Sequence, residues 1–242
     1  MEQLSNAVWH ALTGPQQAMA EGGALAVRFD PAVSVFAALP DEAGAEAWQQ
    51  LAELVGPGNM ALLFRDELDL PDGWTEAFGG IGRQMVWPGS SRRPATGDGA
   101  EVVQLDADDV PEMVALVERT EPGPFSARTI ELGTYLGVRD PADGRLIAMA
   151  GQRLHPPGHV EISAVCTDVD WRGRGLARLL VDRLVDEIRL RDEVPILHAA
   201  ATNVGAIRLY ESMGFETVRE VRFAALQAPG RSGGQAEVAV SG

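Results

Sequence analysis

The sequence contains no lysine, so all 20 of its basic residues are arginines. This absence excludes a lysine Schiff base, a Walker-type phosphate-binding lysine and a lysine acid–base group. The single cysteine, Cys166, excludes an intrachain disulfide framework and any cysteine-rich metal site. Three of the four histidines, His155, His159 and His198, lack metal-ligand spacing, so we expect no metal site.

The sequence also lacks long apolar runs and an excess of positive charge. No apolar run is long enough to cross a bilayer, and the N-terminal segment lacks the blocks of a signal peptide. The formal net charge of −15 disfavours nucleic acids and anionic membranes as partners. With 45% hydrophobic residues among 242, the chain can bury a core. We therefore expect a folded cytoplasmic protein with neither kind of partner.

A polar segment rich in glycine, proline and serine interrupts the chain between residues 88 and 99. It predicts an N-terminal accessory module over 1–93 and a linker over 94–100. A second domain is expected over 101–227, followed by a flexible tail over 228–242.

The accessory module is expected to contain both helices and strands. A helical pattern over residues 5–20 breaks at Gly14-Pro15, and residues 42–55 fit an amphipathic helix. Strands are predicted over 25–29, 33–39 and 60–64. The glycine-rich segment Phe78–Arg83 lacks a clear strand–helix frame, which favours a turn over a phosphate-binding loop.

After the linker, strands and helices alternate more regularly, which predicts a mixed-sheet α/β (α+β) domain. The expected strands are 101–105, 135–139, 146–154, 159–167, 196–201, 215–218 and 221–226. The expected helices are 106–119, 175–191 and 203–213, the last ending at Gly214 as a left-handed cap.

The most informative segment is 166–177, where an apolar strand meets a glycine turn and an amphipathic helix follows. Free N–H groups and the dipole at a helix start attract an anion. Gly173 and Gly175 let the backbone approach that anion closely. Guanidinium groups suited to phosphate oxygens flank the turn, those of Arg172, Arg174 and Arg178. The segment therefore predicts pyrophosphate binding.

A dinucleotide-binding turn is the competing interpretation of this segment. Gly173-Arg-Gly175 supplies only two glycines, and Arg178 stands where the third small residue belongs. The flanking strands also form predicted antiparallel hairpins rather than βαβ units. Both observations disfavour the dinucleotide interpretation.

Two segments resemble the GCN5-related N-acetyltransferase (GNAT) superfamily. Arg172-Gly-Arg-Gly-Leu-Ala177 matches its acyl-CoA signature, and Asn203–Phe215 matches its later Asn…Ala…Tyr…Gly-Phe segment. Glu161–Thr167 is most similar to the FR47-like, glycine N-acyltransferase-like branch. The resemblance covers about residues 101–227 and implies a GNAT fold there. Members of that branch often carry an N-terminal module, sometimes a degenerate copy of the same fold, and residues 1–93 are a candidate for one.

The resemblance implies transfer of an acetyl group from acetyl-CoA to a primary amine within a ternary complex. It leaves open whether the acceptor is a small-molecule amine or a protein N-terminus, and whether the chain forms a homodimer. An alternative is an acyl-CoA-binding regulatory or scaffold protein that has lost catalysis. The intact signature and the presence of Glu161 and Tyr210 favour the enzyme.

The resemblance also implies roles for individual residues. Tyr210 would protonate the leaving thiolate; the alternative is that its side chain only packs in the core. Glu161 would be the general base with a raised pKa; the alternative is that its carboxylate pairs with Arg153. Strand alternation places Ile162, Ala164 and Cys166 on the face opposite Glu161, which favours an inert cysteine over a nucleophile. The expected acyl-CoA contacts are Val165, Cys166, Thr167, Arg172, Gly173, Arg174, Gly175, Leu176, Ala177, Arg178, Asn203 and Tyr210.

Overall fold

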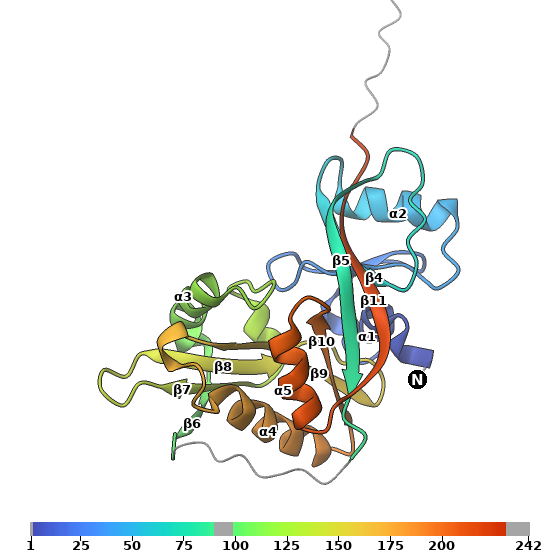
Figure 1. Ribbon diagram of the computed structural model, residues 1–242. Coiled ribbons are helices and arrows are strands. Elements are labelled where there is room, and N and C mark those ends of the chain that lie inside the picture. The colour runs from blue at the N-terminus through green and yellow to red at the C-terminus, as the bar shows by residue number, and fades with distance from the viewer. Residues whose placement is uncertain (1, 90–98, 231–242) are drawn as a thin grey trace, which may run out of the picture.

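The structure is a computed structural model that describes residues 2–89 and 99–230 (Figure 1). Its longer strands are β4 (Met60–Arg65), β5 (Thr75–Val86), β6 (Val102–Leu105), β7 (Tyr135–Arg139), β8 (Leu146–Gln152), β9 (His159–Thr167), β10 (Val194–Ala200) and β11 (Glu216–Gln227). Three short strands are β1 (Ala20–Gly22), β2 (Val27–Phe29) and β3 (Ala37–Ala38). The α-helices are α1 (Ala7–Leu12), α2 (Ala45–Val55), α3 (Val110–Thr120), α4 (Leu176–Arg189) and α5 (Val204–Ser212).

The strands form two sheets. The large sheet has eight strands in the order β4-β11-β5-β10-β9-β8-β7-β6, and the small sheet has the order β1-β2-β3. In the large sheet β9 and β10 pair in parallel, and the other neighbours pair antiparallel. The predicted mixed-sheet α/β fold is confirmed, and β7 and β9 have the bounds that the sequence predicts.

Strand β5 is the main departure from the sequence prediction. The turn expected at Phe78–Arg83 is wrong, because this segment lies inside β5, between β10 and β11. The glycines permit close pairing with β11: a Cβ on Gly79 would lie 2.8 Å from the carbonyl oxygen of Phe223. One on Gly80 would lie 2.7 Å from the Phe223 ring. Figure 1 shows β5 and β11 running side by side through the molecule, so the sheet crosses the predicted boundary between accessory module and second domain.

Three further expectations need correction or restriction. The strand expected over 33–39 shrinks to β3, because the Val33 and Ser34 amides turn back to donate to the Asp30 carbonyl. The two strands expected over 215–226 are one strand, β11, with a register shift between Thr217 and Arg219. The predicted linker lies largely in residues 90–98, and the tail largely in 231–242, both outside the described residues. The start of the tail is packed, since Ala228 is buried and its amide donates to Asn59.

The large sheet is covered on both faces where the predicted site lies. Helix α4 packs its apolar side, including Leu180 and Leu184, against residues of β8 and β9 such as Ile147 and Ile162. Helix α3 packs through Met113 and Leu116 against a separate set of side chains on the same strands. Helix α2 and the small sheet cover the part of the sheet formed by β4 and β11. Among residues 2–89 and 99–230, none of the helices is long and apolar enough to span a bilayer.

Candidate active site

A cleft opens where the neighbouring strands β9 and β10 stop pairing. His159–Ile162 pairs with Val194–Leu197, and both strands then continue without pairing with each other. The space between them belongs to a cleft of about 910 Å³, bounded also by the turn before α4 and by α5. Backbone groups of β9 along this gap need a partner, and an extended ligand can supply one.

A β-bulge in β9 accompanies this opening. Ala164 and Val165 together oppose only Ala150 of β8, and Ala164 has a left-handed backbone with φ of +52°. A bulge redirects the side chains that follow it. Val165 therefore packs in the same core as Ile162, whereas Ala164 and Cys166 pack near α3. The expected strict alternation along β9 is wrong from Ala164 onward.

The turn before α4 has the backbone geometry of an anion site. Gly173 and Gly175 have φ of +78° and +79°, which glycine adopts without strain. Helix α4 has no acidic residue in its first turn and receives no side-chain cap from residues 2–89 or 99–230, so its first N–H groups and its dipole are available to a ligand. They border a pocket of about 250 Å³, which is lined by residues that precede the turn and by residues that follow it. A Cβ on Gly173 would meet no atom of the described residues within 4 Å, so they leave space beside the turn.

The three arginines around this turn differ in where they point. Arg172 lines both the cleft and the smaller pocket, and its Nε donates to the Thr167 carbonyl at 3.2 Å. Arg178 lines the smaller pocket. The Arg174 guanidinium lies 4.3 Å from the centre of the Trp171 ring and lines neither space. Two of the three predicted arginines are therefore brought to the site.

The Thr167 side chain supplies a second sign of a ligand. Its hydroxyl is buried without a hydrogen-bond partner in the described part of the chain, and Thr167 lines both spaces. Leaving a buried hydroxyl unpaired costs free energy, which a bound polar ligand would recover. The uncapped helix, the two arginines and this hydroxyl together fit a phosphate-bearing ligand that continues along β9.

Helix α5 places Asn203 and Tyr210 against the cleft. Asn203 caps the helix, with its Oδ1 accepting from the Ala206 amide at 3.1 Å. Asn203, Ala206 and Tyr210 line the cleft, and Tyr210 also packs in the core together with Ile207. Burial raises the pKa of the Tyr210 phenol, and nearby Cys166 raises it further. The phenol therefore stays protonated at physiological pH and can donate a proton or a hydrogen bond.

Glu161 is fully buried and does not line the cleft. Arg153 donates to its two carboxylate oxygens at 2.8 and 2.6 Å, and the Leu154 amide and His198 Nδ1 also lie within hydrogen-bond distance. Burial acts to raise the pKa of Glu161, but the Arg153 charge and these hydrogen bonds outweigh it and hold that pKa well below its usual range. The expected rise in its pKa is wrong, and the pairing with Arg153 is present.

His198 is a site residue that the sequence analysis missed. It lines the cleft, and its Nδ1 lies 2.7 Å from Glu161 Oε1. Its Nε2 lies 3.0 Å from Gln84 Nε2, which also donates to the Leu4 carbonyl at 2.8 Å. Because the Leu4 carbonyl requires the amide nitrogen at that position, His198 Nε2 must accept and Nδ1 must carry the proton. Only the position of His198 five residues before Asn203 could have drawn attention to it.

Cys166 lines the cleft, and its side chain is buried. It is 7% exposed, and burial raises the pKa of its thiol to about 11. Nucleophilic cysteines need a thiolate at neutral pH, which a lowered pKa provides. The Cys166 environment does the opposite and supports the inert role.

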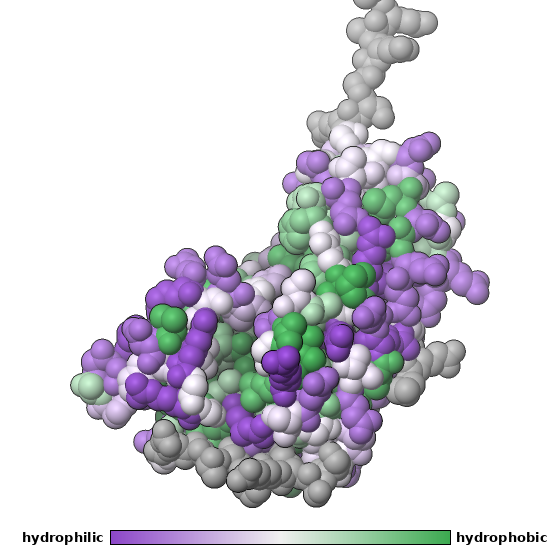
Figure 2. Space-filling model, in the orientation of Figure 1, coloured by the Kyte–Doolittle hydropathy of each residue, from purple (hydrophilic) through white to green (hydrophobic). Residues whose placement is uncertain are grey.

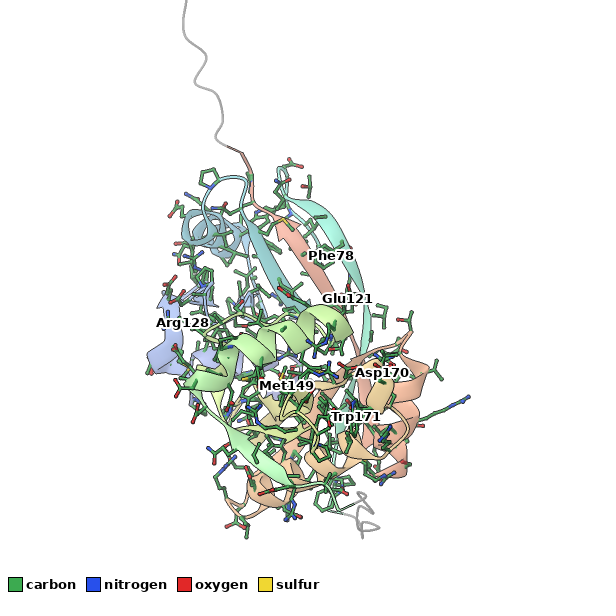
Figure 3. All side chains as sticks on the ribbon, turned by 90° about the vertical axis from the view of Figure 1, so that its left-hand side faces the viewer. Phe78, Glu121, Arg128, Met149, Asp170 and Trp171 are labelled. Carbon is green, nitrogen blue, oxygen red and sulfur yellow. The ribbon has the colours of Figure 1, made fainter. Side chains whose placement is uncertain are left out.

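The mouth of the cleft is formed by two segments far apart in the sequence. The loop of residues 121–124, after α3, and Phe78 of β5 both line the cleft, and Glu121 and Phe78 are both exposed. Figure 3 shows Phe78 and Glu121 near each other, with Trp171 lower, before the α4 turn. The N-terminal region therefore contributes a wall of the same cleft.

Comparison with known proteins is consistent with this geometry. The profile of the FR47-like protein family matches residues 135–224, which run from β7 into β11. A [ribosomal protein bS18]-alanine N-acetyltransferase from Salmonella typhimurium is 32% identical over 115 residues, covering 46% of this chain and 77% of the relative. The N-alpha-acetyltransferase RimI of Mycobacterium tuberculosis is 33% identical over 125 residues, covering 48% of this chain and 77% of the relative.

One solved structure is similar over nearly the whole chain. It comes from Novosphingobium aromaticivorans and is assigned to the GNAT family of acetyltransferases. It is 39% identical, with a TM-score of 0.82, and the match covers 92% of this chain and 97% of the other. The similarity therefore includes much of the N-terminal region that lines the cleft.

Proposed function

Since the chain belongs to the GCN5-related N-acetyltransferase superfamily and is an N-acyltransferase, we propose that it transfers the acetyl group of acetyl-CoA directly to a primary amine. Donor and acceptor would both bind in the cleft between β9 and β10. The observation that carries this proposal is one continuous cleft. It joins the gap beside β9, the glycine turn before α4 and the Tyr210 side chain. Donor and acceptor can therefore meet without a covalent enzyme intermediate.

The donor would bind along β9 and at the turn. Its phosphates would meet the first N–H groups of α4 with Arg172 and Arg178, and its pantetheine arm would pair with the backbone of residues 165–167. The unpaired Thr167 hydroxyl and the Asn203 side chain line the same path. Bound acetyl-CoA supplies the activated thioester carbonyl.

Tyr210 would assist departure of the sulfur. The amine nitrogen attacks the carbonyl carbon, the C–N bond forms, and the C–S bond breaks to give a thiolate. A buried phenol that stays protonated can donate its proton to that thiolate. Water from the open end of the cleft would then restore the phenol.

His198, rather than Glu161, would receive the proton lost by the amine, directly or through a water molecule. His198 lines the cleft, whereas Glu161 lies behind it. Glu161 would act as a positioning residue, because its hydrogen bond to Nδ1 leaves Nε2 as the basic nitrogen. The Gln84 amide that now donates to Nε2 would have to yield to the acceptor.

The acceptor is an amine, and a small-molecule amine and a protein N-terminus both fit the reaction. The Salmonella relative is named for alanine acetylation of a ribosomal protein, which makes a bS18-derived peptide a necessary substrate in any panel. The alternative function is acyl-CoA binding without catalysis, and the observation that favours it is that Glu161, the base implied by the resemblance, does not line the cleft.

One paired experiment tests the proposal. Calorimetry measures acetyl-CoA binding, and release of free CoA thiol is followed with a panel of amines and the peptide. We expect binding, and thiol release that depends on both acceptor and enzyme concentration. Tight binding with no turnover across the panel would favour the non-catalytic alternative.

A further inference from the structure

A second pocket, of about 320 Å³, lies beside the cleft and is built mostly from the region before residue 89. Three large apolar side chains in its lining are exposed: Val35 by 41%, Met60 by 46% and Phe78 by 61%. Figure 2 shows hydrophobic side chains reaching the surface over strands β5 and β11. Gathered exposed apolar side chains around a concave space indicate a binding site rather than scattered surface residues.

The pocket is continuous with the reaction cleft. Phe36, Leu62, Phe78 and Pro124 line both spaces. The Phe36 ring lies 4.7 Å from the centre of the Arg153 guanidinium, which is paired with Glu161. The apolar pocket therefore begins where the buried group of Arg153, Glu161 and His198 ends, on the side expected for the acceptor.

The charges around the two spaces do not suit a polycationic acceptor. Glu121, at the mouth, is the one acidic side chain in the lining of either space among the described residues. In the described part of the chain, Arg28 is the one charged residue that lines the apolar pocket, and Glu21 pairs with it at 2.9 Å. A polyamine would leave its second ammonium group without a carboxylate, which is unfavourable in a half-buried space.

The outer edge of β4, beside the pocket, already pairs with residues 35–36. β4 is an outer strand of the large sheet, but the Leu62 amide donates to the Val35 carbonyl at 3.2 Å, and Phe36 bridges to Leu62. A peptide that added there as a further strand, which is a common way for a chain to bind a sheet edge, would have to displace this contact. The pocket suits one compact group.

We infer that this pocket holds the apolar substituent, aromatic or branched aliphatic, of a small primary amine, with its amino group directed toward the cleft. The inference rests on the proposed function and specifies its acceptor class. Phe78, Met60 and Leu62 contact the substituent, and the low charge of the lining disfavours polyamines.

The experiment compares acetylation of phenethylamine, ethylamine, putrescine and a peptide with an N-terminal phenylalanine. The protein variants are Phe78→Ala and the matched control Ile81→Ala. Ile81 is 45% exposed on the same strand but lines none of the three spaces. We expect kcat/KM for phenethylamine to exceed that for ethylamine by at least about tenfold. Phe78→Ala should abolish most of that preference through KM, and Ile81→Ala should not change it.

Failure of the inference differs from failure of the proposed function. Equal use of ethylamine or putrescine, a preference for the peptide, or an equal loss in both variants would overturn the apolar-acceptor inference while acetyl transfer stands. If no amine is acetylated although acetyl-CoA binds, the proposed function fails. Calorimetry of phenethylamine then decides the pocket: binding weakened by Phe78→Ala supports it, and no binding to the unaltered protein overturns it.

Discussion

Arg153 and Glu161 form a bidentate ion pair beneath the cleft, with Arg153 Nε 2.8 Å from Glu161 Oε2 and Arg153 Nη2 2.6 Å from Glu161 Oε1. Glu161 is completely buried, so the pair is shielded from water and salt. The same carboxylate orients His198, which lies within reach of the cleft. One buried carboxylate thus links folding stability to the orientation of a candidate catalytic group.

Glu161→Gln should lower the free energy of unfolding by about 3–5 kcal/mol near neutral pH, because it leaves the Arg153 charge buried and unpaired. The folded pKa of Glu161 is lowered, so its stabilisation is complete above the pKa of an unfolded glutamate, about 4.3, and is lost as pH falls below it. The difference between variant and wild type should therefore shrink in acid. Urea unfolding at several pH values measures it.

The matched control replaces both charges, as in Arg153→Met with Glu161→Met. Removing the pair together avoids an unpaired buried charge, so the double variant should be more stable than Glu161→Gln. A double variant as unstable as the single one would show that packing, and not the unpaired charge, sets the cost.

Local signals in the sequence predicted the donor side of the site. The strand 159–167, the turn with Gly173 and Gly175 and the helix cap at Gly214 depend on short-range patterns, and all are present. The twelve expected acyl-CoA contacts stay predictions, although Arg174 points elsewhere.

The acceptor side depends on pairing between distant segments, which a single sequence does not reveal. Arg153 follows β8 and His198 comes from β10, and only the sheet order brings both to Glu161 and brings Gln84 of β5 to His198. The bulge at Ala164 likewise follows from the β8–β9 register and not from a local signal. The pKa of Glu161 could not be predicted without these partners.

Tyr210→Phe should lower kcat by about 10²–10⁴-fold if the phenol donates the proton to the thiolate. The KM for acetyl-CoA should change little, because the ring remains. Tyr135→Phe is the matched control, since Tyr135 is the other of the two tyrosines and its buried hydroxyl has no partner in the described part of the chain. Steady-state thiol release compares them. Equal activity of Tyr210→Phe and Tyr135→Phe would remove Tyr210 as the donor.

His198→Gln should also reduce kcat by about 10²–10⁴-fold with little effect on acetyl-CoA binding. His159→Gln is the control, because His159 lies at the start of β9 and does not line the cleft. In the unaltered protein, ¹⁵N NMR of labelled histidine should show His198 protonated at Nδ1, as the Glu161 and Gln84 contacts require. A proton on Nε2 in the free protein, or full activity of His198→Gln, would contradict the base assignment.

Cys166 should not become acetylated during turnover. Burial raises the pKa of its thiol to about 11, so the thiolate is scarce near neutral pH and grows only as pH rises toward that value. Alkylation of the folded protein should therefore be slow and accelerate up to strongly alkaline pH, whereas the urea-unfolded chain should react as an ordinary thiol. Mass spectrometry after mixing with acetyl-CoA alone checks for an acetyl adduct on Cys166, which direct transfer excludes.

The position of β5 inside the large sheet predicts opposite effects for two glycines on that strand. Gly79→Ala should cost about 1–3 kcal/mol, because its Cβ would lie 2.8 Å from the backbone oxygen of Phe223, which cannot move without disturbing β11. Gly82→Ala should be neutral or stabilising by about 0.4–1 kcal/mol, because its nearest neighbour would be the Ala199 oxygen at 3.4 Å and its φ is not left-handed. Chemical denaturation compares the two variants under one set of conditions. Equal stability of the two variants would contradict the close approach of Gly79 to the Phe223 oxygen.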